Sequence, residues 1–484
     1  MSEQTHNETT ENNENETNET ENKEIEDIKN LEIETHKDEE EEEIIQLKSD
    51  QLEDLETELV VQSSDLKSQP IYSQGTFEEL NLKPELLKGV YAMGFNKPSR
   101  IQANALPVII NTKNNLVAQS QSGTGKTGAF TLGMLNCVDP KLNETQVICL
   151  SPTHELSTQI YTFVCKIGQF TNIQPLLVIP DAIIPQTIKS QIIIGTPGKV
   201  GDFLQTKKIN SKHVKMFVLD EADFLVGQRG MKDQVLKIQS YLPKNVRVLL
   251  FSATFSVGVD EVINRMVKEP NVRITLKRSE LSIDKILQYY INCDTSDNKS
   301  IILSELFGYI SVGQAIVFVQ TRATCSSLTK LMMEEGFPVS QLHGDMTTDE
   351  RDQSIKRFKE GKTKILISTN VTSRGIDILQ VSLVINYDMP IDENGKPDPV
   401  LYLHRIGRVG RFGRSGVAIT LVHDETSLKQ ITRISEHLSR PVNELQIDKL
   451  KSLSDILKNL KDLTPLKDSP TTTTTTTTTT SNSK

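Results

Sequence analysis

Short apolar runs alternate with helical patterns over most of the chain. Between Phe77 and about Lys277, runs rich in Val, Ile and Leu are separated by segments whose apolar residues recur at helical spacing; the clearest runs begin at Asn115, Gln146, Gln191, Met216 and Arg247. Continuous apolar runs of this length are typical of strands buried on both faces of a parallel sheet. Each run ends in a small or polar cluster. Because ligands of open α/β sheets bind at the carboxyl ends of strands, we expect functional residues there.

The alternation restarts after the polar stretch at 277–282, with runs that begin at Ile286, Gln314, Lys364, Val381 and Gly416. This repetition predicts an α/β fold with two tandem parallel-sheet domains. We assign residues 71–277 to the first domain, 278–285 to a linker and 286–460 to the second domain.

The two ends of the chain have another character. The Asn/Glu/Thr-rich start and the ten threonines Thr471–Thr480 contain little that could be buried, so disorder is expected over most of 1–66 and over 461–484. Between the acidic start and the first domain, apolar residues recur near helical spacing, which predicts an acidic amphipathic helix over 43–61. Such a helix could compete with RNA for a basic cleft. A free acidic linker is the alternative.

Charge is distributed unevenly along the 484 residues. Residues 1–60 contain 23 Asp/Glu against 4 Lys/Arg, a net charge of −19, which leaves +9 on the rest of a chain whose total is −10. A basic body favours nucleic acid as a partner. The five cysteines show no CxxC spacing, which indicates free thiols and no structural zinc. We find no apolar stretch of 18 residues and expect no membrane insertion.

Two motifs carry the chemistry of a nucleotide hydrolase. Ser120–Thr127 reads SQSGTGKT, in which Gly123 and Gly125 let backbone N–H groups close around phosphates, Lys126 reaches the β- and γ-phosphates, and Thr127 offers its hydroxyl to Mg²⁺. The loop also contributes Ser120, Gln121, Ser122 and Thr124 to the predicted ATP site.

The second motif is Asp220-Glu221-Ala222-Asp223, directly after the apolar run that begins at Met216. A strand here would deliver Asp220 to the metal and Glu221 to the attacking water. Taken singly, the first motif could be a Gly/Ser turn and the second an acidic helix start. In this order, they predict a protein that binds ATP with Mg²⁺ and hydrolyses it.

With these motifs, Ser252-Ala253-Thr254 and the HRIGRVGR segment 404–411 at strand ends, the chain from about Phe77 to Val442 resembles the DEAD-box ATP-dependent RNA helicases. The resemblance implies two RecA-like domains that close over ATP and a single strand of RNA. It also implies that Ser252, Ala253 and Thr254 couple ATP-site closure to RNA remodelling.

The same resemblance implies the remaining nucleotide contacts. In the segment 75–103, Gln102 matches the residue that reads adenine and Phe77 the aromatic that stacks on it; an ordinary core Phe is the alternative for Phe77. Gly375 and Asp377 match positions that contact the nucleotide.

The resemblance also implies a catalytic contribution from the second domain. Arg408 and Arg411 lie three positions apart and match the arginine fingers of the family, which complete the site only when the domains close. Such residues contribute roughly 10³ to 10⁵ in rate. Together with Glu221 and Lys126 they form the predicted catalytic set.

The positions that match RNA contacts are mostly hydroxyls, backbone amides and arginines, which bind phosphate and 2′-OH without reading bases. They are Pro152, Thr153, Glu155, Thr196, Pro197, Gly198, Arg322, Gly344, Arg351 and Thr369. We therefore expect sequence-independent, salt-sensitive RNA binding.

Several positions depart from the broad family. They are His154 and Lys199, each in place of an arginine, Thr348 in place of a glutamine, Asn370 in place of an aspartate and Val409 in place of a threonine. The family's paired-glycine RNA contact is also missing between Ile179 and Thr196. These departures concern the RNA path and leave the ATP chemistry untouched.

One insertion, Asn394-Gly395-Lys396-Pro397-Asp398, resembles the loop found at this place in the DEAD-box helicases of nuclear mRNA export. That resemblance implies a monomeric protein that is found in the cytoplasm and the nucleus and acts at the cytoplasmic face of the nuclear pore. It implies a filament nucleoporin and an export factor dependent on inositol hexakisphosphate as partners. An ATP-gated RNA clamp remains an alternative function. A translation-initiation helicase is disfavoured by the insertion and the acidic arm.

Overall fold

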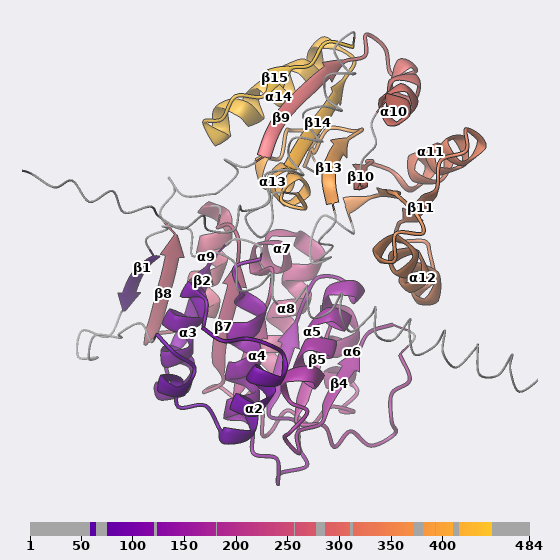
Figure 1. Cartoon of the computed structure of the whole chain (residues 1–484). Helices are drawn as coiled ribbons and strands as arrows, with labels where there is room; N and C mark the ends of the chain where they lie inside the picture. The colour runs from indigo at the N-terminus through magenta and orange to yellow at the C-terminus, as the bar shows by residue number, and fades with distance from the viewer. Residues whose placement is uncertain are drawn as a thin grey trace, which may run out of the picture. The chain divides into compact units, whose positions relative to one another are not determined.

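The structure, a computed structural model, describes residues 59–63, 75–120, 123–180, 182–255, 257–276, 286–309, 313–370, 381–392, 394–409 and 416–447 (Figure 1). The chain divides into two compact units, Met1–Leu281 and Ser282–Lys484. This division falls within the segment 278–285 that we assigned as the linker, and that segment itself lies outside the described residues.

The first unit is built on an eight-stranded sheet with the order β1-β8-β2-β7-β6-β3-β5-β4. All neighbouring strands are parallel except β1 and β8. In sheet order, the bounds are Leu59–Ser63, Asn271–Leu276, Asn115–Gln119, Arg247–Ser252, Met216–Leu219, Val147–Leu150, Ile192–Gly195 and Pro175–Val178. The central strands β3, β5 and β6 are buried at every position, because helices cover both faces.

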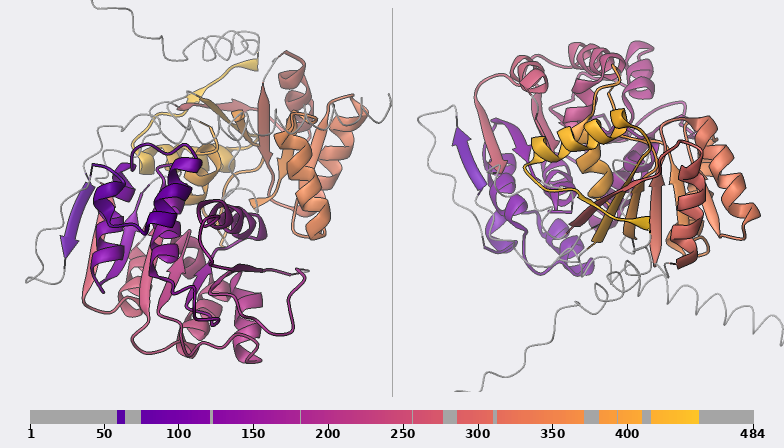
Figure 2. Two further views of the ribbon diagram at one scale, coloured as in Figure 1. Left: turned by 60° about the horizontal axis from the view of Figure 1, so that its bottom comes forward. Right: turned by 90° about the horizontal axis from the view of Figure 1, so that it is seen from above.

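Successive residues of these strands enter two separate cores. Cys149 of β3 packs in the core that contains residues of α2 to α5, whereas its neighbour Leu150 packs in the core that contains residues of α6 to α9. The helices of the first unit are η1 (Glu78–Leu80), α2 (Pro84–Ala92), α3 (Arg100–Asn111), α4 (Lys126–Cys137), α5 (His154–Ile167), α6 (Pro197–Gln205), α7 (Ala222–Gly227), α8 (Arg229–Tyr241) and α9 (Val257–Met266). The two views of Figure 2 show these helices on either side of the sheet.

The second unit repeats this plan with a seven-stranded, all-parallel sheet of order β11-β12-β10-β13-β14-β9-β15. In sheet order, its strands are Val339–Leu342, Ile365–Ser368, Gln314–Phe318, Val381–Asn386, Gly416–Val422, Ile286–Asn292 and Asn443–Glu444. Its helices are α10 (Asn298–Tyr309), α11 (Arg322–Glu334), α12 (Thr348–Lys359), α13 (Pro399–Ile406) and α14 (Glu425–Leu438). One core contains residues of α10 and α11, and the other contains residues of α12, α13 and α14.

The predicted α/β architecture is confirmed, and all ten strands expected from apolar runs are present. The strands β1, β4, β8, β11 and β15 were not anticipated, and most of them lie at or next to a sheet edge. Within the described residues, no helix is both long and apolar enough to cross a membrane. The acidic start, the segment 43–58 and the threonine tail lie outside the described residues.

The expected helix over 43–61 is wrong at its carboxyl end. Leu59–Ser63 forms β1, which pairs antiparallel with β8 so that Leu59 lies opposite Leu276 and Ser63 opposite Val272 (Figure 1). Two consecutive β-branched residues, Val60 and Val61, favour a strand, and the edge of β8 offers unpaired backbone groups that the strand satisfies. Helical spacing of apolar residues was therefore outweighed by pairing with a distant segment.

One close helix crossing depends on a glycine. A Cβ placed on Gly89 of α2 would lie 2.0 Å from the carbonyl oxygen of Ile167 at the end of α5. The position of this Cβ is fixed by the backbone of α2, and the oxygen belongs to the backbone of α5. An added methyl group would therefore push α2 away from the core that Leu86 and Val90 help to fill.

We therefore expect Gly89→Ala to destabilise the protein by about 1–3 kcal/mol, measured as a lower midpoint of thermal unfolding. Gly258→Ala is the matched control, since Gly258 also lies in a helix but a Cβ there meets nothing within 4 Å. The control should leave the midpoint unchanged or raise it slightly. Equal effects of the two substitutions would contradict the proposed role of the α2–α5 crossing.

Candidate functional site

The phosphate loop joins β2 to α4 at the carboxyl edge of the first sheet. Gly123 and Gly125 have φ values of 81° and 95°, a backbone region that side-chain-bearing residues rarely adopt. Lys126 is buried, and its Nζ donates to the carbonyl oxygen of Ser120 at 2.5 Å, while the hydroxyls of Ser120 and Thr124 hydrogen-bond each other. The loop thus holds the lysine ammonium at the start of α4, where the helix N-terminus also favours anions.

Gln102 contacts this loop directly. Its Oε1 accepts the N–H of Ser99 at 3.0 Å as part of a capping box at the start of α3, and its Nε2 donates to the carbonyl oxygen of Gly125 at 3.2 Å. A Cβ at Gly125 or Gly128 would lie 2.8 or 2.4 Å from this Nε2, so a side chain at either position would displace the Gln102 amide from its bond to the loop. The predicted adenine-reading amide therefore also senses the conformation of the phosphate loop.

Phe77 occupies a different environment from the one that adenine stacking requires. Its side chain is only 1% exposed and packs in the core shared with α2 to α5. The structure places Phe77 as a core residue, the alternative that the sequence left open. Stacking on adenine stays a prediction that would require the ring to become exposed.

The acidic motif begins where β6 ends. Asp220 and Glu221 are each 4% exposed, and the backbone N–H of Glu221 donates to Oδ1 of Asp220 at 3.0 Å. Glu221 has a φ of 50°, in the left-handed region, and caps α7. Burial, reinforced by the charge of Glu221 and opposed by Lys126, raises the pKa of Asp220 to about 7. Two buried carboxylates side by side fit a divalent cation, whose charge would stabilise their ionised forms. Thr127, in the first turn of α4, would add a hydroxyl oxygen.

The segment Ser252-Ala253-Thr254 is bonded to the acidic motif and to the strand that leads into the phosphate loop. The hydroxyl of Thr254 donates to Oδ2 of Asp223 at 2.7 Å, and the N–H of Asp223 donates to Oγ of Ser252 at 3.3 Å. The side chain of Gln119, the last residue of β2, donates to the carbonyl oxygen of Ala253 at 3.3 Å. A shift of the acidic motif would therefore be felt at the end of β7.

The predicted RNA contacts of the first unit gather at two neighbouring helix N-termini. β3 and β5 are adjacent, and they lead into α5 and α6, whose N-cap positions are occupied by Thr153 and Thr196 respectively. Such N-termini attract backbone phosphates. Gly198, in the first turn of α6, is partly exposed. Pro152, Glu155 and Pro197 are buried, so their side chains support this sheet edge from within and are not exposed for contact with RNA.

In the second unit, Arg322 opens α11 and forms an ion pair with Asp345. A Cβ at Gly344 would lie 3.4 Å from Nη2 of Arg322, so the structure brings these two predicted RNA contacts together. Arg351, on α12, and Thr369, directly after β12, are both largely buried. Arg408 is also buried, and its Nε donates to the carbonyl oxygen of His404 at 3.2 Å.

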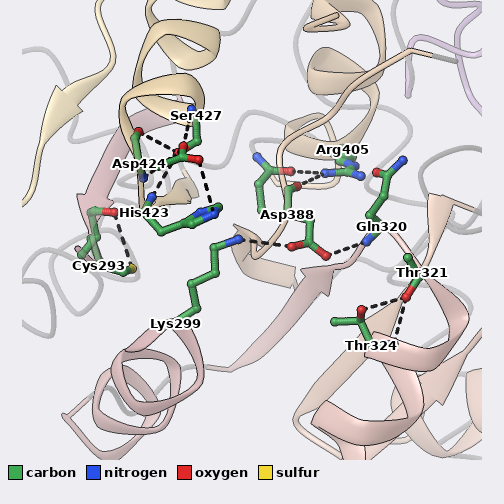
Figure 3. A network of polar contacts seen from close by, with 12 residues as sticks. Cys293, Lys299, Gln320, Thr321, Thr324, Asp388, Arg405, His423, Asp424 and Ser427 are labelled. Carbon is green, nitrogen blue, oxygen red and sulfur yellow. Dashed lines mark hydrogen bonds and ion pairs between the residues drawn. The ribbon is translucent and has the colours of Figure 1, made fainter. Parts of the chain in front are cut away.

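A cluster of charged side chains around Asp388, with Lys299 and Arg405, was missed by the sequence analysis (Figure 3). The carboxylate of Asp388 accepts Nζ of Lys299 at 3.2 Å on one oxygen and the backbone N–H of Gln320 at 2.8 Å on the other. The guanidinium of Arg405 donates to the backbone oxygen of Asp388 at 2.8 Å. Because Lys299 and Asp388 are 89 positions apart, no local spacing in the sequence could signal their pairing.

The remaining predicted site residues lie outside the part of the chain that the structure describes. They are Gln121, Ser122, Gly375, Asp377 and Arg411.

Comparison with known proteins agrees with this geometry. Residues 99–262 match the DEAD/DEAH box helicase family, and residues 298–413 match the helicase conserved C-terminal domain. The ATP-dependent RNA helicase ddx19 of Dictyostelium discoideum is 55% identical over 421 residues, which cover 87% of this chain and 90% of the relative. ATP-dependent RNA helicase DBP5 of Yarrowia lipolytica is 46% identical over 83% of each chain.

Solved structures give the same answer for the fold. S. cerevisiae Dbp5 bound to RNA and ADP BeF3 superposes with a TM-score of 0.77 at 44% identity, over 80% of this chain and 99% of the other. A single-residue variant of S. cerevisiae Dbp5, bound to nup159, a gle1 variant, ip6 and ADP, superposes with a TM-score of 0.56 at 42% identity, over 79% of this chain and all of the other. The chain therefore belongs to the DEAD-box ATP-dependent RNA helicases and, among them, to the group that includes ddx19 and DBP5.

Proposed function

We propose that this helicase uses RNA-dependent ATP hydrolysis to remodel RNA–protein complexes or short RNA duplexes during mRNA export. The observation that carries the proposal is the position of the Ser-Ala-Thr segment, which is hydrogen-bonded both to the start of the phosphate loop, through Ser120, and to the acidic motif, through Asp223. The residues suited to ATP hydrolysis thus lie at the same carboxyl edge of the first sheet as the N-termini of α5 and α6.

The described residues suggest a division of roles in the first unit. Lys126 binds the β- and γ-phosphates, and Thr127 and Asp220 would hold Mg²⁺, which would neutralise phosphate charge. Glu221, held in its left-handed turn next to Asp220, orients the attacking water and accepts its proton. By the family resemblance, we assign to Arg408 and Arg411 of the second unit the stabilisation of the charge that develops on the γ-phosphate.

RNA binding is proposed to involve phosphates and ribose hydroxyls alone. Helix N-termini, hydroxyls and arginines such as Arg322 supply this chemistry and carry no base code. The complex of yeast Dbp5 with nup159, gle1 and ip6 supports equivalent partners for this chain, namely a pore nucleoporin and an export factor that uses inositol hexakisphosphate. By the same argument, we propose that the protein acts at the cytoplasmic face of the nuclear pore.

Single-stranded RNA should raise ATP turnover sharply, whereas single-stranded DNA of the same length and sequence should raise it little, because DNA lacks the 2′-OH. Steady-state hydrolysis measured with matched oligonucleotides checks this. Strand displacement from a short RNA duplex, followed in the same buffer, should require ATP. Equal stimulation by DNA would overturn the RNA assignment.

Glu221→Gln should lower turnover by roughly 10² to 10⁴, because an amide cannot accept the proton of the attacking water. Binding of RNA in the presence of ATP should persist, since Lys126 and Asp220 remain. Glu261→Gln, on the exposed face of α9 in the same unit, is the matched control and should behave as wild type. Unchanged turnover of the Glu221 variant would refute its proposed role.

A further inference from the structure

Arg405 joins one helix to three neighbouring strands of the second sheet. It lies in the last turn of α13 and is fully buried. Its Nε and Nη2 donate to Oδ1 of Asn370 at 3.1 and 2.7 Å, and its Nη1 donates to Oδ1 of Asn386 at 3.1 Å. Its guanidinium also lies 5.2 Å from the ring centre of Phe318. Asn370, Phe318 and Asn386 lie at the carboxyl ends of β12, β10 and β13, which are adjacent in the sheet.

Among the described residues, this guanidinium donates its hydrogen bonds to neutral oxygens. Asn370 and Asn386 supply amide oxygens and Asp388 supplies its backbone carbonyl, while the Asp388 carboxylate is directed to Lys299 and to the backbone of Gln320 (Figure 3). Burial lowers the pKa of Arg405 to about 9, which leaves the side chain charged at neutral pH. A buried cation held by neutral acceptors is bound more weakly than one paired with a carboxylate.

The backbone transmits the position of Arg405 to Arg408. The N–H of Arg408 donates to the carbonyl oxygen of Arg405 at 3.2 Å, and Nε of Arg408 donates to the carbonyl oxygen of His404. A movement of the Arg405 side chain would therefore turn the segment that carries Arg408. Asn370 in turn follows Thr369, a proposed RNA contact.

We propose that Asn370 is a positioning residue: through Arg405 it sets the place of the arginine finger Arg408, and its neutral amide makes this clamp weaker than a carboxylate would. The inference rests on the proposed role of Arg408 in hydrolysis. The inference explains in physical terms why an asparagine at position 370, where the broad family has an aspartate, would matter. The amide links the RNA contact at Thr369 to the finger without locking the finger in place.

Asn370→Ala should lower the RNA-stimulated kcat about tenfold, since hydrogen bonds to a charged group are lost. The KM for ATP should stay within about twofold, because the phosphate loop belongs to the other unit and Asn370 is not itself one of the predicted nucleotide contacts. Gln288→Ala is the matched control: Gln288 is buried and accepts a hydrogen bond from Tyr402 of the same helix at 3.0 Å, without touching Arg405. It should lower the midpoint of thermal unfolding but leave kcat within about twofold. Equal losses of kcat in the two variants would reduce Asn370 to a structural role and overturn the proposal.

Asn370→Asp provides the opposite change and keeps the shape of the side chain. A carboxylate should grip Arg405 with two charge-assisted bonds, raise the midpoint of unfolding and raise kcat about two- to fivefold. A loss of kcat similar to that of Asn370→Ala would overturn the proposal.

Combination with Arg408→Ala separates the proposal from the function on which it rests. If Arg408→Ala leaves turnover intact, the finger assignment itself is wrong. If Arg408→Ala abolishes most of the turnover, Asn370→Ala should add no further loss in that background, because it acts through Arg408. Additive losses would contradict the positioning role while leaving the finger assignment in place.

Discussion

Burial of the strands on both faces is the constraint on which the functional arrangement depends. A sheet with helices on each face needs crossover connections, so its strands run parallel and all their carboxyl ends meet at one edge. In the first unit, this edge receives the phosphate loop, the acidic motif, the Ser-Ala-Thr segment and the starts of α5 and α6. In the second unit, it receives Thr369, Asp388 and the acceptors of Arg405. The functional residues lie in the connections between strands and helices, whereas their geometry is fixed by the cores of the two units.

Buried charge is handled differently at the two edges. In the first unit, Asp220 and Glu221 lie side by side with Lys126 as the nearby opposing charge, so the pair is suited to an incoming cation. In the second unit, Lys299 and Asp388 neutralise each other and Arg405 is held by neutral oxygens, which leaves a buried positive charge near Arg408.

The sequence was most informative where a local run of residues determines the structure. Long apolar runs identified the central strands, and SQSGTGKT and DEAD followed them as predicted. Contacts between distant segments were not visible in this way. The capping of α3 by Gln102 and its bond to Gly125, the burial of Phe77, and the cluster around Arg405 all depend on residues far apart in the chain. Short edge strands were missed because they bury less surface and need no long apolar run.

The direction of β1 has a consequence for the acidic start of the chain. β8 runs parallel to β2, so Leu276 lies at the carboxyl edge of the first sheet, and the antiparallel register places Leu59 beside it. The segment before Leu59, which holds the −19 net charge, is thereby tethered at the edge where RNA is proposed to bind. A tethered polyanion acts at an effective concentration that depends on the length of its tether and is independent of how much protein is present. If the acidic segment competes with RNA, one of the two alternatives that the sequence leaves open, dilution would weaken RNA binding without weakening the competition, whereas salt would screen both.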